Sequence, residues 1–260
     1  MYKRYKMRVV VKVGSSTLVY ENGKMNIHRV NELCEVLADL KNAGHEVILV
    51  SSGAIALGVG KLALTQKPKD IPTKQAAASV GQCELMYNYD RIFSKYNHTV
   101  SQILLTGADF ESMDRHQNFN NTILRLLQLG VLPIINENDT IATDEIKVGD
   151  NDTLSALVAV SVQADLLVIL SDIDGLYSAD PRKDATATLI EEVYAIDEKI
   201  LALAGDSGSD LGTGGMKTKL HAVNLCKEVG CDTVIANGKS PSLLYDIVAG
   251  KKGKYTRFFH

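Results

Sequence analysis

The sequence lacks features that mark several common classes of protein. No apolar stretch approaches the roughly 20 residues that a membrane-spanning helix needs. The basic start, residues 1–6, is followed by an apolar run that contains a lysine and soon meets glycine, which is typical of a first strand and not of a signal peptide. The four cysteines form no C-x-x-C pair and are too scattered for a zinc site. We therefore expect a soluble, cytoplasmic protein with reduced thiols.

A strong excess of charge is also missing. The 28 basic and 31 acidic side chains give a formal net charge of −3, which argues against a nucleic-acid binder. The composition, 45% hydrophobic and 23% charged, is that of an ordinary globular protein. A small anionic substrate would therefore need a local cluster of lysines and backbone N–H groups.

Three well-known site motifs are absent. The chain contains no G-x-x-x-x-G-K-[ST], so it is not a P-loop protein. No G-x-G-x-x-G follows the first apolar run, which disfavours a dinucleotide-binding oxidoreductase. The absence of G-x-S-x-G likewise disfavours an α/β-hydrolase.

What is present is an alternation of β-branched runs with segments of helical period. The runs are continuously apolar, as in strands buried on both faces, and apolar stripes at helical spacing around residues 30–41 and 119–127 lie between them. This pattern predicts an open, mainly parallel sheet with helices on both faces. The predicted strands are residues 7–13, 46–51, 100–105, 131–136, 166–171 and 233–236.

The chain shows no internal repeat and no linker rich in proline or serine. We therefore expect a single domain over residues 1–260, with an N-terminal lobe of about 1–165 and a C-terminal lobe of about 166–260 on one sheet. The polar, alternating residues 140–148 predict a hairpin beside the sheet. The glycine- and serine-rich residues 205–215 predict a long loop that precedes a helix from about Met216.

Polar or glycine-rich residues follow five of the predicted strands and hairpin arms. In open α/β sheets, ligands bind at the carboxyl ends of the strands. Convergence of five such ends on one edge therefore predicts a site there. The segments are residues 12–16, 51–54, 136–139, 149–152 and 171–175.

Each segment also has a plainer interpretation. Lys12 lies in an apolar run, where an unpaired ammonium is costly, so it is either an edge-strand lysine that reaches water or a phosphate ligand. The glycines and serines at 14–16 and 52–53 form plain turns or bring backbone N–H groups close to a phosphate. Asp139 and residues 150–152 are turn formers, or acids whose repulsion a nearby cation relieves. Ser171 and Asp172 form only a turn after a strand, or they belong to the site.

The most informative segment is Gly212 to Lys219. Glycines lead into a helix that begins with Lys217 and Lys219, although lysine is unfavourable at the positive end of a helix. A bound anion would relieve that conflict; a solvated loop is the alternative. Together the segments predict a polyanion site suited to phosphoryl transfer, with the substrate left open.

These segments resemble the glutamate 5-kinases of the amino acid kinase superfamily. The similarity extends from the first strand to about Gly238, and the segments around 136–139 and 147–152 are its most specific part. It implies a three-layer αβα sandwich in which the N-terminal lobe binds glutamate and the C-terminal lobe binds nucleotide. It also implies a transferase that uses ATP and Mg²⁺ to phosphorylate the γ-carboxylate of L-glutamate to γ-glutamyl phosphate, the first step of proline biosynthesis.

The same resemblance implies roles for individual residues. For glutamate binding the residues are Ser52, Asp139 and Asn151. For catalysis at the transferred phosphoryl group they are Lys12, Asp152 and Lys219. For the nucleotide they are Lys12, Ser171, Asp172, Thr213, Gly214, Gly215, Met216, Lys217, Thr218 and Lys219.

The sequence departs from the family pattern in two ways. It stops near the end of the kinase domain, so we expect no PUA domain, and Ser171 stands where threonine is common. The resemblance implies a homo-oligomer, inhibition by proline, and hand-off of product to glutamate-5-semialdehyde dehydrogenase, with no nucleic-acid or membrane partner. Two alternatives stay open: a kinase of N-acetylglutamate, carbamate or a nucleoside monophosphate, and a regulator without catalysis, which the presence of all three catalytic residues disfavours.

Overall fold

One sheet organises the computed structural model, which describes residues 6–142, 151–204 and 215–260. Within these residues the sheet has eight strands in the order β3-β4-β2-β1-β5-β7-β8-β6. From β3 to β7 the neighbours are parallel, whereas β8 runs antiparallel to β7 and pairs with the short β6 at the edge. The strands are β1 (Arg8–Val13), β2 (Glu46–Ser51), β3 (Val100–Leu105), β4 (Leu132–Glu137), β5 (Leu166–Ser171), β6 (Glu192–Val193), β7 (Asp232–Asn237) and β8 (Tyr255–Phe258).

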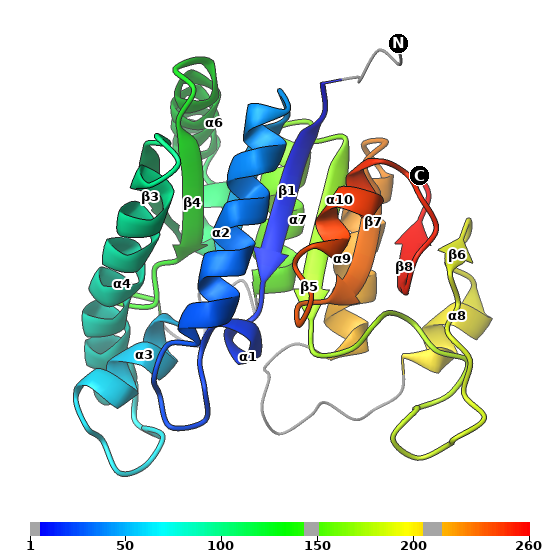
Figure 1. The fold of residues 1–260 in the computed structure, drawn as a ribbon, viewed down its shortest axis with the longest axis horizontal. Coiled ribbons are helices and arrows are strands. Elements are labelled where there is room, and N and C mark those ends of the chain that lie inside the picture. Colours follow the sequence, from blue (N-terminus) through cyan, green and yellow to red (C-terminus); the bar gives the residue numbers. More distant parts are fainter. Residues whose placement is uncertain (1–5, 143–150, 205–214) are drawn as a thin grey trace.

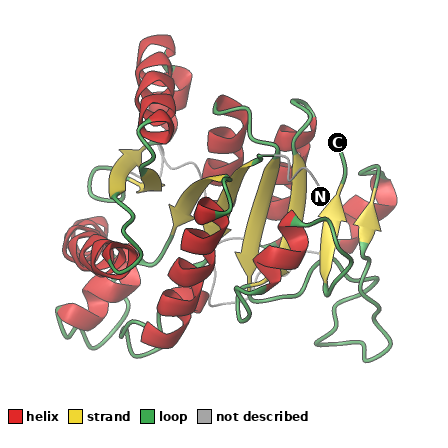
Figure 2. Ribbon diagram, turned by 45° about the horizontal axis from the view of Figure 1, so that its top comes forward, coloured by secondary structure: helices red, strands yellow, loops and turns green. Residues whose placement is uncertain are grey.

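Helices cover both faces of this sheet (Figures 1 and 2). Apolar side chains of α2, α4 and α10 form a core on one face, and those of α6, α7 and α9 form a second core on the other. Alternate residues of β1 serve the two cores: Val9 and Val11 belong to the first and Val10 to the second. The helices are α1 (Ser15–Leu18), α2 (Ile27–Asn42), α3 (Ala54–Lys61), α4 (Ile71–Ser94), α5 (Gly107–Glu111), α6 (Met113–Gln128), α7 (Asn151–Ser161), α8 (Glu198–Leu203), α9 (Met216–Lys227) and α10 (Leu243–Val248).

The predicted three-layer αβα sandwich with a mainly parallel sheet is therefore confirmed. All six predicted strands are present, with ends that differ by at most one residue. The edge strands β6 and β8 were not predicted. Residues 143–148 of the predicted hairpin and the loop residues 205–214 lie outside the described part of the chain, and the division into two lobes stays a prediction.

The order in which strands are added to the sheet reverses at β1. From β1 the chain moves to β2 on one side, and it later returns to β5 on the other side. A crevice at the carboxyl ends of such neighbouring strands is the usual ligand site of an open α/β sheet. No helix of the described residues is long and apolar enough to cross a membrane.

Helices α3 and α4 cross very closely beside the end of β2. A Cβ atom on Gly81 of α4 would collide with the backbone oxygen of Ala54, and one on Gly58 of α3 would collide with that of Ala77. Glycine at both positions lets the two backbones touch. Only Ser52 and Gly53 separate β2 from the start of α3, and so α4 is fixed against the carboxyl end of that strand.

Candidate active site

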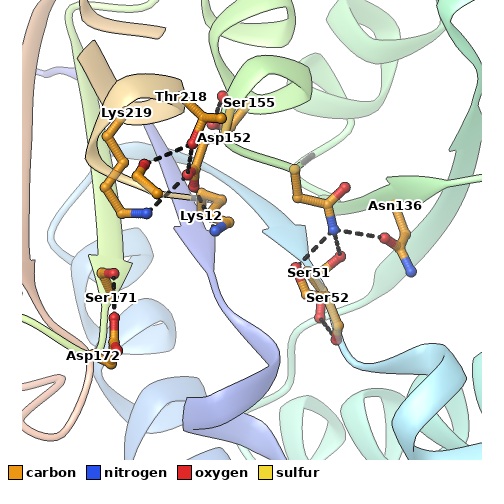
Figure 3. A network of polar contacts seen from close by, with 12 residues as sticks. Lys12, Ser51, Ser52, Asn136, Asp152, Ser155, Ser171, Asp172, Thr218 and Lys219 are labelled. Carbon is orange, nitrogen blue, oxygen red and sulfur yellow. Dashed lines mark hydrogen bonds and ion pairs between the residues drawn. The ribbon is translucent and has the colours of Figure 1, made fainter. Parts of the chain in front are cut away.

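A buried carboxylate, Asp152, lies between two lysines from distant parts of the chain (Figure 3). Lys12 is the next-to-last residue of β1, and its Nζ is 2.5 Å from Asp152 Oδ1. Lys219 is in the first turn of α9, and its Nζ is 3.0 Å from Asp152 Oδ2. The three side chains that the family resemblance assigned to catalysis are thus in contact.

The charged side chains of this cluster are buried, so they interact with one another with little screening by water. Asp152 is 0% exposed, Lys12 8% and Lys219 4%. Burial by itself would raise the pKa of Asp152, but the positive charges of Lys12 and Lys219 outweigh it and hold that pKa below its ordinary value. Asp152 is therefore ionised at neutral pH, and the three side chains by themselves sum to one positive charge. Because β1 is a central strand and Lys12 is buried, the alternative of an edge-strand lysine reaching water is wrong.

The cluster also joins the amino-terminal ends of two helices. Asp152 is in the first turn of α7, where a negative charge is favourable. The Thr218 hydroxyl of α9 lies 3.1 Å from Asp152 Oδ2 and 2.8 Å from the Gly215 carbonyl oxygen. Ser155 Oγ donates to the backbone oxygen of Asp152 at 2.6 Å. Asp152 therefore cannot move without disturbing both helices.

A second cluster surrounds Asn151, the residue before Asp152. Asn151 Nδ2 is 2.7 Å from Ser52 Oγ, 3.0 Å from the Ser51 carbonyl oxygen and 3.0 Å from Asn136 Oδ1. Two predicted substrate residues are thus brought together: Ser52, which follows the carboxyl end of β2, and Asn151, the first residue of α7. Among the described residues, Asn151 Oδ1 is buried and has no hydrogen-bond partner. A buried acceptor of this kind is suited to a donor on a ligand.

Local backbone geometry presents Ser52 to Asn151. The next residue, Gly53, has φ of +99° at the start of α3, a left-handed conformation that favours glycine. Tyr89 of α4 helps to fix the start of this turn, because its hydroxyl is 2.9 Å from Ser51 Oγ. A side chain at position 53 would strain this turn and displace Ser52.

Asn136 joins this cluster, although no role was predicted for it. It is 2% exposed near the end of β4, and its Oδ1 accepts hydrogen bonds from Asn151 Nδ2 and from the Glu137 backbone N–H. The available signal was a polar residue at the end of an otherwise apolar strand. Asp139 lies half-buried in the turn after β4, and its predicted contact with substrate stays a prediction.

Apart from Lys12 of β1, the described residues that were predicted for the nucleotide lie around β5 and α9. Ser171 ends β5, and its Oγ donates to Asp172 Oδ1 at 3.1 Å. Gly215 precedes α9, Lys217 is exposed in its first turn, and Met216 packs against the second core. Thr213 and Gly214 lie outside the described residues. Because β5 is next to β1 and parallel to it, Ser171 and Asp172 lie at the same carboxyl end of the sheet as Lys12.

Comparison with known sequences identifies similar proteins over nearly the whole chain. Residues 7–237 match the amino acid kinase family. The chain is 54% identical over 243 residues to a glutamate 5-kinase of Clostridium tetani (strain Massachusetts / E88), covering 94% of this chain and 91% of that protein. It is 51% identical over 246 residues to a glutamate 5-kinase of Caldanaerobacter subterraneus subsp. tengcongensis, covering 95% of this chain and 66% of that longer protein.

Solved structures of low sequence identity share the fold. The carbamate kinase of Giardia lamblia bound to AMP-PNP matches with a TM-score of 0.69 at 18% identity, over 98% of this chain and 99% of that chain. The UMP kinase of Ureaplasma parvum matches with a TM-score of 0.67 at 16% identity, over 98% and 99% of the two chains.

Proposed function

This chain belongs to the amino acid kinase family, among the glutamate 5-kinases, and on that premise we propose that it transfers the γ-phosphoryl group of ATP to the side-chain carboxylate of L-glutamate. The products are ADP and γ-glutamyl phosphate, and the reaction begins proline biosynthesis. The observation that carries the proposal is the buried Asp152 between Lys12 and Lys219, next to the amide cluster of Asn151.

The chemistry needs cations and positioning more than a base. A side-chain carboxylate is already ionised at neutral pH, so its oxygen can attack the γ-phosphorus directly while the bond to the leaving ADP oxygen breaks. The obstacle is the approach of two anions, and most catalysis of phosphoryl transfer comes from alignment and stabilisation of charge. In this proposal Lys12 and Lys219 stabilise the transferring group, and Asp152 keeps their ammonium groups apart and oriented.

Mg²⁺ enters the proposal as the counter-ion of ATP. Mg²⁺ keeps several water ligands and is usually bound through one or two carboxylates plus substrate phosphates. The exposed carboxylate of Asp172, at the end of β5, fits such a partial contribution. Both carboxylate oxygens of Asp152 face lysines, so we propose that Asp152 orients the lysines and does not bind Mg²⁺. Bound Mg²⁺ would neutralise charge on the phosphate oxygens.

The activity is tested by measuring ADP release that depends on both ATP and L-glutamate, with hydroxylamine added to trap the acyl phosphate as a hydroxamate. Carbamate, N-acetylglutamate and a nucleoside monophosphate are run in parallel. Hydroxamate formed only with L-glutamate supports the proposal. Turnover of another acceptor instead would assign the chain a different substrate, and no turnover with any acceptor would favour a regulator.

We expect free L-glutamate to be phosphorylated and N-acetylglutamate to be rejected by at least about 100-fold in kcat/KM. Asn151 Oδ1 is a buried acceptor suited to the α-ammonium group of glutamate, and the carboxylate of Asp139 follows β4 at the same edge. Acetylation removes the positive charge and adds bulk, so the polar groups of the site lose their partner. Comparable kcat/KM values for the two acceptors would contradict the assignment.

We also propose that proline, the end product of the pathway, inhibits this chain by competing with glutamate. Proline shares an α-carboxylate and a cationic nitrogen with glutamate, but it has no γ-carboxylate to phosphorylate. We expect millimolar proline to raise the apparent KM for glutamate and leave kcat unchanged, as initial rates at several proline concentrations would show. Rates that do not respond to proline would remove this regulation from the proposal.

The remaining parts of the proposal concern the setting of the enzyme. We infer a cytoplasmic homo-oligomer that passes γ-glutamyl phosphate to glutamate-5-semialdehyde dehydrogenase. The chemical reason for a hand-off is that an acyl phosphate is readily hydrolysed by water. Light scattering of the purified protein would give its mass in solution, and co-elution with the dehydrogenase would test the hand-off.

A further inference from the structure

We propose that Gln82 of α4 is a positioning residue for the amino-acid substrate, and that it acts through Asn136 and Asn151. This inference rests on the proposed function. Gln82 is 8% exposed, and its Oε1 accepts a hydrogen bond of 3.0 Å from Asn136 Nδ2. Asn136 Oδ1 in turn accepts from Asn151 Nδ2 at 3.0 Å. Three side-chain amides, those of the buried Gln82 and Asn136 and of the half-buried Asn151, therefore form a chain that runs from a helix to the candidate substrate site.

Two backbone groups fix which way this chain runs. The Ser51 carbonyl oxygen can only accept, so the atom of Asn151 that is 3.0 Å away must be the nitrogen. The Glu137 N–H can only donate, so the atom of Asn136 at 2.9 Å must be the oxygen. Asn136 Nδ2 then faces Gln82 and needs an acceptor there, which Gln82 Oε1 provides.

The orientation of the Asn151 amide determines which of its two polar atoms is left for the substrate to contact. With Nδ2 of Asn151 directed at Ser51, Ser52 and Asn136, Oδ1 is the remaining polar atom of this amide, and it is buried without a partner among the described residues. An ammonium group of the substrate would satisfy it. Without Gln82, Asn136 Nδ2 loses its buried acceptor, and rotation of Asn136 to find another would remove a contact that orients Asn151.

The fold explains why a helix residue can do this. Gly81, immediately before Gln82, lets α4 touch the backbone of α3 at Ala54. Tyr89, two turns further along α4, bonds Ser51 at 2.9 Å. The same helix therefore supports the ends of both β2 and β4. The lysine cluster of Asp152 is built from β1, α7 and α9, so Gln82 is expected to affect the binding of glutamate more than the chemical step.

The test compares Gln82→Met with wild type, because methionine keeps the length of the side chain and cannot accept a strong hydrogen bond. We expect the Kd and KM for glutamate to rise about tenfold, the scale for one buried polar group left without its partner. The KM for ATP should stay within about threefold, a range set by the same conversion. Gln82→Glu retains an acceptor and should lie closer to wild type.

Asn88→Leu is the matched control. Asn88 is a buried amide on the same helix that bonds within α4, to the backbone and side chain of Glu84. It should lower the melting temperature and leave the KM for glutamate unchanged. Equal glutamate affinities for Gln82→Met, Asn88→Leu and wild type would overturn the proposal.

A double-mutant cycle separates positioning from general destabilisation. If Gln82 acts through Asn136, then Gln82→Met should add little to the KM of Asn136→Ala, because the two changes break one chain. Additive effects would overturn the inference. Should Gln82→Met not fold, Gln82→Ser, whose small hydroxyl leaves room for water, carries the same comparison. A wild-type protein that does not use glutamate would overturn the proposed function as well, whereas an active wild type with unchanged variants overturns this inference alone.

Discussion

Replacing Lys219 with alanine is expected to lower kcat by about 100-fold or more, the scale for losing one electrostatic contact to the transition state. Lys219 is 4% exposed, and its ammonium group is 3.0 Å from Asp152. As charge shifts from the γ-phosphoryl group to the leaving ADP, a buried cation gains interaction energy. In the proposed site glutamate is held by the Asn151 cluster and not by Lys219, so the KM for glutamate should change much less than kcat.

Lys227→Ala is the matched control for this variant. Lys227 is the last residue of the same helix and bonds the Tyr194 carbonyl oxygen at 2.9 Å. Both variants lose one lysine from α9, but only Lys219 is part of the cluster around Asp152. Steady-state rates with saturating ATP and glutamate provide the comparison. Near-normal kcat for Lys219→Ala would remove this lysine from the mechanism.

The sequence predicted the parallel sheet well because its central strands, from β4 to β7, are buried on both faces. Runs such as residues 166–171 are continuously apolar, and their ends contrast sharply with the polar segments that follow. The edge strand β6 has only two residues, Glu192 and Val193, and it forms because β8 is beside it. A pairing that depends on a distant partner leaves little trace in local sequence.

The residues of the site likewise divide into those that the local sequence could identify and those that depend on distant partners. Lys12 and Lys219 could be identified because lysine is unusual in an apolar strand and at the start of a helix. Their shared contact with Asp152 requires three distant segments to meet, which only the family resemblance supplied. Gln82 could not be identified at all. It is one polar residue on a long helix, and its importance comes from the strand end to which Gly81 brings it.

Replacing Asp152 with asparagine is the second change expected to have a large effect. The neutral amide keeps the shape of the side chain but leaves Lys12 and Lys219 buried without their common carboxylate. We expect kcat to fall by about 100-fold or more, on the scale of one lost electrostatic contact. Breaking a buried ion pair from one side should also lower the free energy of unfolding by about 3–5 kcal/mol.

The pH dependence of this stability difference follows from the pKa of Asp152. The lysines hold the folded-state pKa of Asp152 below its ordinary value, although burial opposes them. The ion pairs therefore stabilise the wild type fully above the pKa that the unfolded chain shows, about 4, and this stabilisation is lost as pH falls through the lower folded value. Denaturant titrations of both proteins should give a large difference at neutral pH that shrinks in acid.

Asp232→Asn separates the proposed catalytic role of Asp152 from a structural one. Asp232 is another buried carboxylate in an ion pair, 2.7 Å from Arg257 Nη2, but it lies at the start of β7, at the opposite end of the sheet from the Lys12 cluster. It should lower the free energy of unfolding and leave kcat close to wild type. If Asp152→Asn also loses stability while keeping its kcat, then Asp152 only holds α7 and α9 together, and the lysines need no carboxylate to orient them for the transfer.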